Sequence, residues 1–288
     1  YIPALEGSDL NEDPYTPITN ETKNMIKELG DETKIKWIHR SERYTEKLAT
    51  PDVTVSDLIG DVDPIKAATL KLPYSDERVI HFGLIPRSHR SIFVINELPD
   101  LQARIQVSLF NILQESDIQI RGFKIRLKLD IQFIFTANPE DYTNRGSIVT
   151  PLKDRIDSQI LTHYPKSIYV SQRITEQEAD ISDQQNSSVV VYPLVKEIIE
   201  QIAIEARSSE YVDEKSGVSA RLTISAYENI ISYAERRKII NDESKAYCRI
   251  SDIVGVIPAI TGKVELVFEG EQEGPVKVAN ILIGKAIK

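Results

Sequence analysis

A carboxylate follows a strongly apolar run near the middle of the chain. Ser91 to Ile95 form that run, and Asn96 and Glu97 come directly after it. Such a run predicts a strand that is buried on both faces, as in a parallel sheet covered by helices. Ligands bind at the carboxyl ends of these strands, where Glu97 could orient a water molecule or hold a cation through one. The alternative is an ordinary strand-to-helix turn with a capping acid.

A second polar pair, Thr136 and Asn138, follows another apolar run. Ile131 to Phe135 predict a second buried strand, and Pro139 stops it. Both polar side chains can hydrogen-bond a phosphate oxygen or a water molecule. The alternative is an Asx-type turn before Pro139. Two polar strand ends at one edge of a sheet are more informative than either alone, and together they favour a site at that edge.

The elements around these strands must place them side by side. Asp63 is expected to cap a helix that begins at Pro64 and ends near Leu70. Asp100 is expected to cap another helix, whose apolar stripe includes residues 101–113. Strands that alternate with helices are typical of an α/β layer, and the fold class is therefore predicted to be α/β.

Further elements complete this first region. Residues 118–129 alternate around Arg121-Gly122 and predict a β-hairpin. Residues 151–157 have a helical pattern, and Ile160-Leu161 form a third short apolar run.

After Pro165 the pattern becomes helical. Helices are expected at 175–185, 192–207, 219–237 and 251–260, then a strand at 264–268 and a helix that begins at Pro275. We predict an α/β domain over 1–170, a helical domain over 171–260, and the start of a further segment over 261–288.

Composition limits the class of protein. The 288 residues are 41% hydrophobic and 27% charged, which is ordinary for a globular chain with room for about two domains. No run approaches the about 18 apolar residues of a membrane span. The single cysteine excludes a disulfide framework and a Cys-based zinc site, so the cytoplasm is the expected compartment. The net charge of −9 argues against nucleic-acid binding over the whole surface but leaves room for a local basic patch.

Several segments, taken in order, resemble the AAA+ ATPases and specifically their magnesium-chelatase subunit I branch. No single motif is specific, but their order and spacing are, over about residues 1–240. Phe82 to Glu97 are similar to the branch's "pGLLarAnRGiLyvDE", which ends in the Walker B motif, and residues 58–63 are similar to its "rvvGtlDie". Residues 135–140 are similar to the sensor 1 segment "GsGNPEE", and residues 152–157 to "LLDRFg", which carries the arginine finger. Residues 216–222 lie where the lid helix presents sensor 2.

The resemblance implies a partial AAA+ core, with a parallel sheet, flanking helices and an inserted β-hairpin, followed by an all-helical lid. It implies ATP and Mg²⁺ as substrate and cofactor of the full-length protein, with Mg²⁺ near Asn96 and Glu97 and no metal held directly. Positioning and charge neutralisation dominate phosphoryl transfer. The implied roles are water activation by Glu97, γ-phosphate sensing by Asn138 with Thr136 nearby, insertion of Arg155 into the neighbouring subunit's nucleotide in a ring, and lid closure by Arg221.

Two departures from the family pattern matter. No segment of the chain has the GxxxxGK[ST] spacing of the Walker A loop. We therefore expect a fragment that starts after the P-loop, does not bind ATP tightly and is inactive alone. Asn96 stands where the family has aspartate, and an amide lacks the charge that helps to hold Mg²⁺. Because Glu97 is intact, we expect a slow but working ATPase in the parent protein.

The predicted hairpin is basic, with Arg121, Lys124 and Arg126 among its residues. Helicase-like relatives use a hairpin at this place to contact the substrate, so DNA or an acidic protein segment could bind here. The alternative is that these side chains are the outward face of an alternating strand.

The leading hypothesis is a chelatase-like or MoxR-like motor that couples ATP hydrolysis to remodelling of a protein partner. By resemblance, the partner carries a von Willebrand A-type domain and the motor is a homo-oligomeric ring. The first alternative is a DNA-associated AAA+ regulator of the enhancer-binding or helicase-like type. The second is a nucleotide-gated scaffold that does not hydrolyse ATP.

Overall fold

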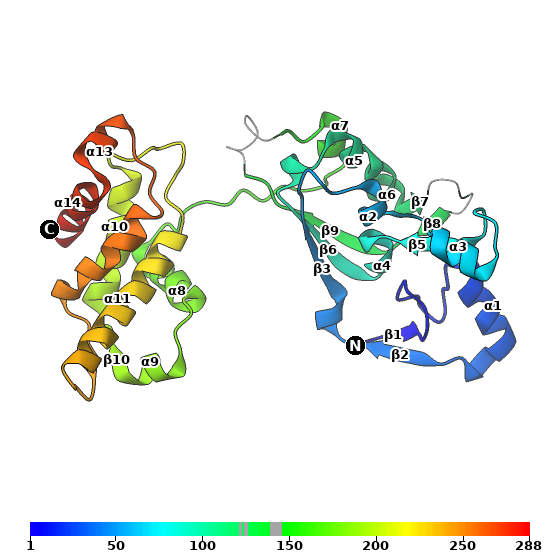
Figure 1. The fold of residues 1–288 in the computed structure, drawn as a ribbon, viewed down its shortest axis with the longest axis horizontal. Helices are drawn as coiled ribbons and strands as arrows, with labels where there is room; N and C mark the ends of the chain where they lie inside the picture. The colour runs from blue at the N-terminus through cyan, green and yellow to red at the C-terminus, as the bar shows by residue number, and fades with distance from the viewer. Residues whose placement is uncertain (121–122, 124–125, 139–145) are drawn as a thin grey trace. The chain divides into compact units, whose positions relative to one another are not determined.

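The chain divides into two compact units, Tyr1–Ile160 and Leu161–Lys288, in the computed structural model (Figure 1). The structure describes residues 1–120, 123, 126–138 and 146–288. Over these ranges, no helix combines the length and the apolar character that crossing a membrane requires.

A parallel three-stranded sheet lies at the centre of the first unit (Figure 1). Its strands are β3 (Tyr44–Leu48), β6 (Ser91–Asn96) and β9 (Ile131–Phe135), in the order β3-β6-β9. Both pairs are parallel, so the three carboxyl ends lie at the same edge. The predicted α/β class is confirmed.

One face of this sheet packs into the core of the unit. Phe93 and Ile95 of β6 are buried there, and Phe133 and Phe135 of β9 pack against the same core. The rings of Phe93 and Phe133 meet edge to face with centroids 5.9 Å apart. These residues alternate along their strands, as a two-residue period requires.

The other face is largely open. Tyr44, Leu48, Ile92 and Ile134 are between 39% and 53% exposed, and Val94 alone among the apolar side chains of this face is buried. The prediction that β6 and β9 are buried on both faces is therefore wrong for the residues described. A continuous apolar run shows that both faces can be buried, but not that this chain supplies the covering element.

Short helices cover the packed side of the sheet. The region predicted as one helix capped by Asp100 instead contains a 3₁₀ turn, η4, and two α-helices. Asp100 lies in η4, and Gln102 precedes the first helix. The apolar stripe is still buried, because Ile105, Leu109 and Ile112 all pack into the core. The helices of this part are η4 (Leu98–Asp100), α5 (Ala103–Ser108), α6 (Phe110–Glu115) and α7 (Thr150–Lys153).

Two glycines allow a tight crossing beside the sheet. β4 (Gly60–Val62) pairs antiparallel with β5 (Ile80–Phe82), between α2 (Val55–Leu58) and α4 (Leu84–Arg87). A Cβ atom on Gly83 would lie 2.5 Å from the carbonyl carbon of Leu58, and one on Gly60 would lie 2.3 Å from the carbonyl oxygen of His81. Both glycines occur in the motif segments, and close backbone approach is the physical reason for them.

Other predicted elements of this unit are found with small shifts. α3 (Pro64–Leu70) begins after Asp63, whose carboxylate accepts two backbone N–H bonds. β7 (Asp117–Gln119) and β8 (Arg126–Lys128) form the predicted antiparallel hairpin, although Arg121 and Lys124 lie outside the described residues. Ile160 and Leu161 are exposed and belong to no strand.

The amino-terminal part is attached at the sheet edge opposite to Asn96. It consists of β1 (Ile2–Leu5), which pairs antiparallel with β2 (Ile35–Ile38), and α1 (Asn20–Leu29). Arg90 ties it to β6, because its guanidinium donates to the carbonyl oxygen of Pro3 at 2.6 Å. The neighbouring His89 is buried, and its Nδ1 accepts the N–H of Asp130 at 2.9 Å. Burial lowers the pKa of His89 below its ordinary value.

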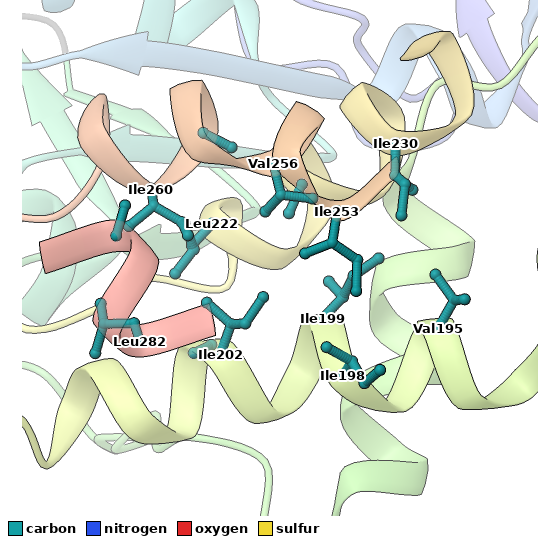
Figure 2. Close-up of a cluster of buried hydrophobic side chains, with 14 of the residues drawn as sticks. Val195, Ile198, Ile199, Ile202, Leu222, Ile230, Ile253, Val256, Ile260 and Leu282 are labelled. Atoms are coloured by element: carbon teal, nitrogen blue, oxygen red, sulfur yellow. The ribbon is translucent and has the colours of Figure 1, made fainter. Parts of the chain in front are cut away.

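The second unit is helical apart from a pair of two-residue strands, β10 (Val189–Val190) and β11 (Ala246–Tyr247). Side chains from several helices meet in one apolar core (Figure 2). Ile198, Ile199 and Ile202 of α10 lie in it with Leu222 of α11 and Leu282 of α14. The helices are α8 (Ile168–Glu178), α9 (Asp183–Ser188), α10 (Pro193–Arg207), α11 (Arg221–Ile240), η6 (Ile250–Val256), α12 (Ile257–Thr261), α13 (Phe268–Glu273) and α14 (Pro275–Ile287).

Two predictions for this unit need correction. The helix predicted over 175–185 is two helices, because Ser182 starts α9 with a capping box that closes on Gln185. The strand predicted over 264–268 is absent from the structure of this fully described segment: Leu266 forms only an isolated bridge with Val212, and α13 begins at Phe268.

Candidate functional site at the carboxyl edge of the sheet

Thr136 joins the two polar strand ends. Its hydroxyl donates to the side-chain oxygen of Asn96 at 3.2 Å and accepts the backbone N–H of Glu97 at 3.1 Å. Its backbone continues the pairing, because its N–H donates to the carbonyl of Ile95 and its carbonyl accepts from Leu98 N–H. One threonine therefore fixes both the side chain of Asn96 and the turn that carries Glu97.

Glu97 has a left-handed backbone conformation, with φ 55° and ψ 51°. For an L-residue with a side chain this costs about 1–2 kcal/mol. The residues that follow, Leu98 and Pro99, are buried and hold the turn in place. Strained positions that the surroundings enforce occur often at functional sites, and here the turn holds a half-buried carboxylate at the strand end.

The loop after β3 closes the same edge. The N–H of Ala49 donates to the carbonyl of Asn96 at 2.8 Å. The side-chain amide of Gln102 donates to the carbonyl of Pro51 at 2.5 Å. Sequence reasoning missed both contacts, because neither residue has a recognisable motif and each bond joins segments more than 45 positions apart.

Asn138 lies two residues beyond Thr136 and is exposed. The predicted sensor segment continues into residues 139–140, which are outside the described ranges.

Arg155, the predicted arginine finger, is docked on its own unit. Its guanidinium donates to Gln114 Oε1 at 3.1 Å and to the carbonyl of Pro151 at 2.7 Å. The same group lies 4.8 Å from the centre of the Phe110 ring. Phe110 and Gln114 are four residues apart on α6, on one helix face, and this spacing is the signal by which the sequence could have indicated the docking place.

Arg221 belongs to the second unit, where it is the first residue of α11 and is exposed. A cation at a helix amino terminus is opposed by the helix dipole, so helix stability does not favour it there. The N–H groups of Arg221 and Leu222 already donate to Ser219, so the group at this helix end that can contact an anion is the guanidinium of Arg221.

Of Arg121, Lys124 and Arg126, which are the predicted contact residues of the hairpin, only Arg126 lies within the described ranges. Its guanidinium forms an ion pair with Asp117 at 3.5 Å across the hairpin, and its side chain is 69% exposed. Among the residues the structure describes, no cluster of three or more His, Cys, Asp or Glu side chains is arranged to hold a metal ion.

The comparisons with known proteins concern the fold. No family model matches the chain. Three solved structures of AAA+ proteins are similar to it: a candidate ATPase from Cytophaga hutchinsonii ATCC 33406 (17% identity, TM-score 0.34, 84% of this chain and 77% of that chain), the complex of subunits BchI and BchD of magnesium chelatase (14%, 0.37, 84% and 75%), and NtrX from Brucella abortus in complex with ADP (14%, 0.47, 85% and 51%). These distant likenesses assign no activity, substrate or partner.

Proposed function

We propose that this chain is part of the hydrolytic core of an AAA+ motor of the magnesium-chelatase or MoxR type. The observation that carries the proposal is the bridge made by Thr136, whose hydroxyl bonds Asn96 Oδ1 and Glu97 N–H. In an ordinary strand-to-helix turn, no side chain from a neighbouring segment is needed to hold the capping residue. Here the Thr136 hydroxyl holds the backbone of Glu97 in a left-handed conformation.

In this proposal Glu97 orients the water molecule that attacks the γ-phosphate. Asn96 fits a supporting role toward Mg²⁺, because its Oδ1 accepts one bond from Thr136 and has a second lone pair for a metal-bound water. The Mg²⁺ ion, when bound, neutralises charge on the phosphate oxygens. The amide of Asn96 supports it less strongly than a carboxylate would, since it has no charge.

The phosphate-binding loop must be supplied by residues outside this sequence, because the GxxxxGK[ST] spacing does not occur in it. The sheet has room for such an element. Within the described residues β9 pairs only with β6, and Ile92 and Ile134 are exposed on the open face. A strand beside β9 followed by a helix over this face would cover both. We therefore propose that this chain binds ATP tightly only together with that element.

The arginines act on the nucleotide from two directions. Arg155 would reach the nucleotide of a neighbouring subunit in a ring. Its contacts to Gln114 and Phe110 would either break for this or stay in place while α6 is brought to the neighbour with it. Arg221 would contact the phosphates from the helical unit. On the sequence resemblance, the ring works on a protein partner with a von Willebrand A-type domain, and Asn138 senses the γ-phosphate.

The test is Mg²⁺-dependent ATP hydrolysis by the protein with a P-loop strand and helix supplied ahead of Tyr1. We expect turnover in this form, and a loss of about 100-fold or more on Glu97→Gln, because a positioned acid–base group contributes about that much. Glu28→Gln, which changes an exposed glutamate on α1, is the matched control and should leave turnover unchanged.

Each other outcome decides between hypotheses. Turnover that survives Glu97→Gln removes Glu97 from the reaction. Tight ATP binding without turnover favours a nucleotide-gated scaffold over a motor. A protein that binds no nucleotide in this form overturns the proposal.

A further inference from the structure

The segment before α11 is held by residues from separate parts of the helical unit. Residues 213–220 are the last part of the connection between α10 and α11, and Arg221 follows directly. Near the start of this segment, the Ser216 hydroxyl lies between the carboxylates of Asp213 and Glu265. Its end is held by two different side chains, and these determine where α11 begins.

Tyr164 makes the first of these contacts. Its hydroxyl accepts the backbone N–H of Val218 at 3.0 Å. Gly217 has φ +65°, and a Cβ atom there would lie 2.7 Å from the same hydroxyl. The tyrosine therefore fits against a position where both the backbone conformation and the space favour glycine. Pro165 follows and limits Tyr164 to extended conformations, so the tyrosine stands on a stiff piece of chain.

Arg207, the last residue of α10, makes the second contact. Its guanidinium lies over the Tyr164 ring, 4.0 Å from the centroid, and its Nε donates to the carbonyl of Val218 at 3.2 Å. The N–H and the C=O of Val218 are thus both bonded, one by each partner. The side chain of Val218 is buried in the core of the unit. We call Tyr164, Arg207 and Val218 the clamp.

The clamp is three residues from Arg221. Between them, Ser219 accepts the N–H of Arg221 at 3.1 Å through its hydroxyl, and Leu222 is buried directly after. Every step from Val218 to the start of α11 is therefore fixed, whereas the Arg221 side chain itself is exposed. Tyr164 is also the fourth residue of the second unit, in residues 161–164, where the chain enters this unit. A shift of this stretch would be passed to the amino terminus of α11.

We propose that Tyr164 and Arg207 are positioning residues, which set the place of Arg221 and transmit movement of residues 161–164 to it. This inference rests on the proposed function, in which Arg221 contacts the nucleotide phosphates. The clamp touches no phosphate itself. Its effect on hydrolysis passes entirely through Arg221.

The experiment is a double-mutant cycle with Tyr164→Phe and Arg221→Ala, in the protein with the P-loop element supplied. Phenylalanine retains the ring under Arg207 and removes only the hydroxyl. We expect Tyr164→Phe to lower kcat about 3- to 10-fold, the equivalent of one neutral hydrogen bond, with KM for ATP changed less. In the Arg221→Ala background it should have no further effect. Tyr169→Phe, at an exposed tyrosine of α8, is the matched control.

A second measurement does not depend on hydrolysis. In the 288-residue chain, Tyr164→Phe should speed amide hydrogen exchange at Val218 while the buried middle of α11 keeps its protection. Unchanged exchange at Val218 overturns the clamp. Equal, additive losses of kcat in the two backgrounds overturn the positioning role and leave the proposed function intact. If Arg221→Ala itself leaves kcat and KM unchanged, the proposed role of Arg221 fails, and this inference fails with it.

Discussion

Replacement of Thr136 by valine tests whether the bridge at the strand ends matters to the reaction. Valine has nearly the same shape as threonine, and the substitution removes only the hydroxyl. The side chain of Asn96 loses its donor and the N–H of Glu97 loses its acceptor. The backbone bonds of residue 136 to Ile95 and Leu98 are unaffected, so the strands stay paired.

The magnitude follows from the two lost bonds. A neutral hydrogen bond contributes about 0.5–1.5 kcal/mol net, and Thr136 is exposed, so water replaces part of each bond. We expect the free energy of unfolding to fall by about 1 kcal/mol. The left-handed conformation of Glu97 costs a similar amount, and without the bridge this residue can relax to another conformation. If the Glu97 carboxylate moves away from its position, kcat of the Thr136→Val variant should fall about 10-fold, with KM for ATP little changed.

Two assays separate the site from the fold. Urea denaturation gives the free energy of unfolding, and steady-state ATP hydrolysis by the P-loop-supplied form gives kcat. Thr136→Ser keeps the hydroxyl and should behave as the unaltered protein. The reasoning is refuted if the valine and serine variants have the same kcat. A loss of stability above about 3 kcal/mol would show that Thr136 supports the fold rather than the site.

Three further predictions concern stability and reactivity. Gly83→Ala should destabilise the first unit by about 2–3 kcal/mol in urea, because its Cβ would meet backbone atoms of Leu58 and Ile59 that cannot move aside; Gly284→Ala, where nothing lies within 4 Å, should be neutral or stabilising. Burial lowers the pKa of His89, so the unfolded chain takes up a proton near pH 6.5 that the folded chain does not bind there. The free energy of unfolding should therefore fall as the pH drops below about 6.5. The fall should be less steep in the His89→Gln variant. Burial raises the pKa of the Cys248 thiol to about 11, so a thiol reagent at pH 8 should label it only when the helical unit opens, at a rate that rises with urea.

Specific results would contradict each of these. An alanine at 83 that leaves the urea midpoint unchanged would mean that β4 and β5 can separate at no cost. A pH profile that is identical with and without His89 would place the acid sensitivity elsewhere. Rapid labelling of Cys248 without urea would contradict its burial.

Local patterns predicted the elements that local physics fixes. Asp63 caps a helix because its carboxylate reaches N–H groups two and three residues away, and Pro64 fits the first helical position. The long amphipathic pattern of α10 was equally clear, since its apolar residues line one stripe against the core. In both cases the deciding contacts lie within a few residues or follow the helical period.

The misplaced elements depended on distant contacts. The stripe after Asp100 is apolar at helical spacing, yet the buried turn at Leu98 and Pro99 delays the helix to Ala103. The period shows which side chains enter the core but not where the backbone becomes helical. The burial of a strand's second face likewise depends on whether another element covers it, and the pattern of the strand carries no information on that element.

The candidate site divides in the same way. Sequence alone brought Asn96, Glu97 and Thr136 to one edge, because parallel strands share an edge and each run ends at a polar pair. It did not predict that Thr136 bonds the other two, which depends on the exact register of β6 against β9. The docking of Arg155 on α6 was also not predicted, since it joins side chains 41 residues apart.

The departure at Asn96 is also better defined by the structure than by the motif. The Thr136 hydroxyl donates to Asn96 Oδ1, and a carboxylate oxygen would accept the same bond in the same place. The amide therefore preserves the bond that an aspartate would accept at this place, and differs from an aspartate in having no charge and an NH2 donor in place of the second oxygen. Since Glu97 is held by its backbone N–H and by the buried residues after it, its position does not depend on that charge. Under the proposed function, such a site would hold Mg²⁺ more weakly and would still place Glu97 to orient a water molecule. The proposal therefore favours slow hydrolysis over an inert scaffold.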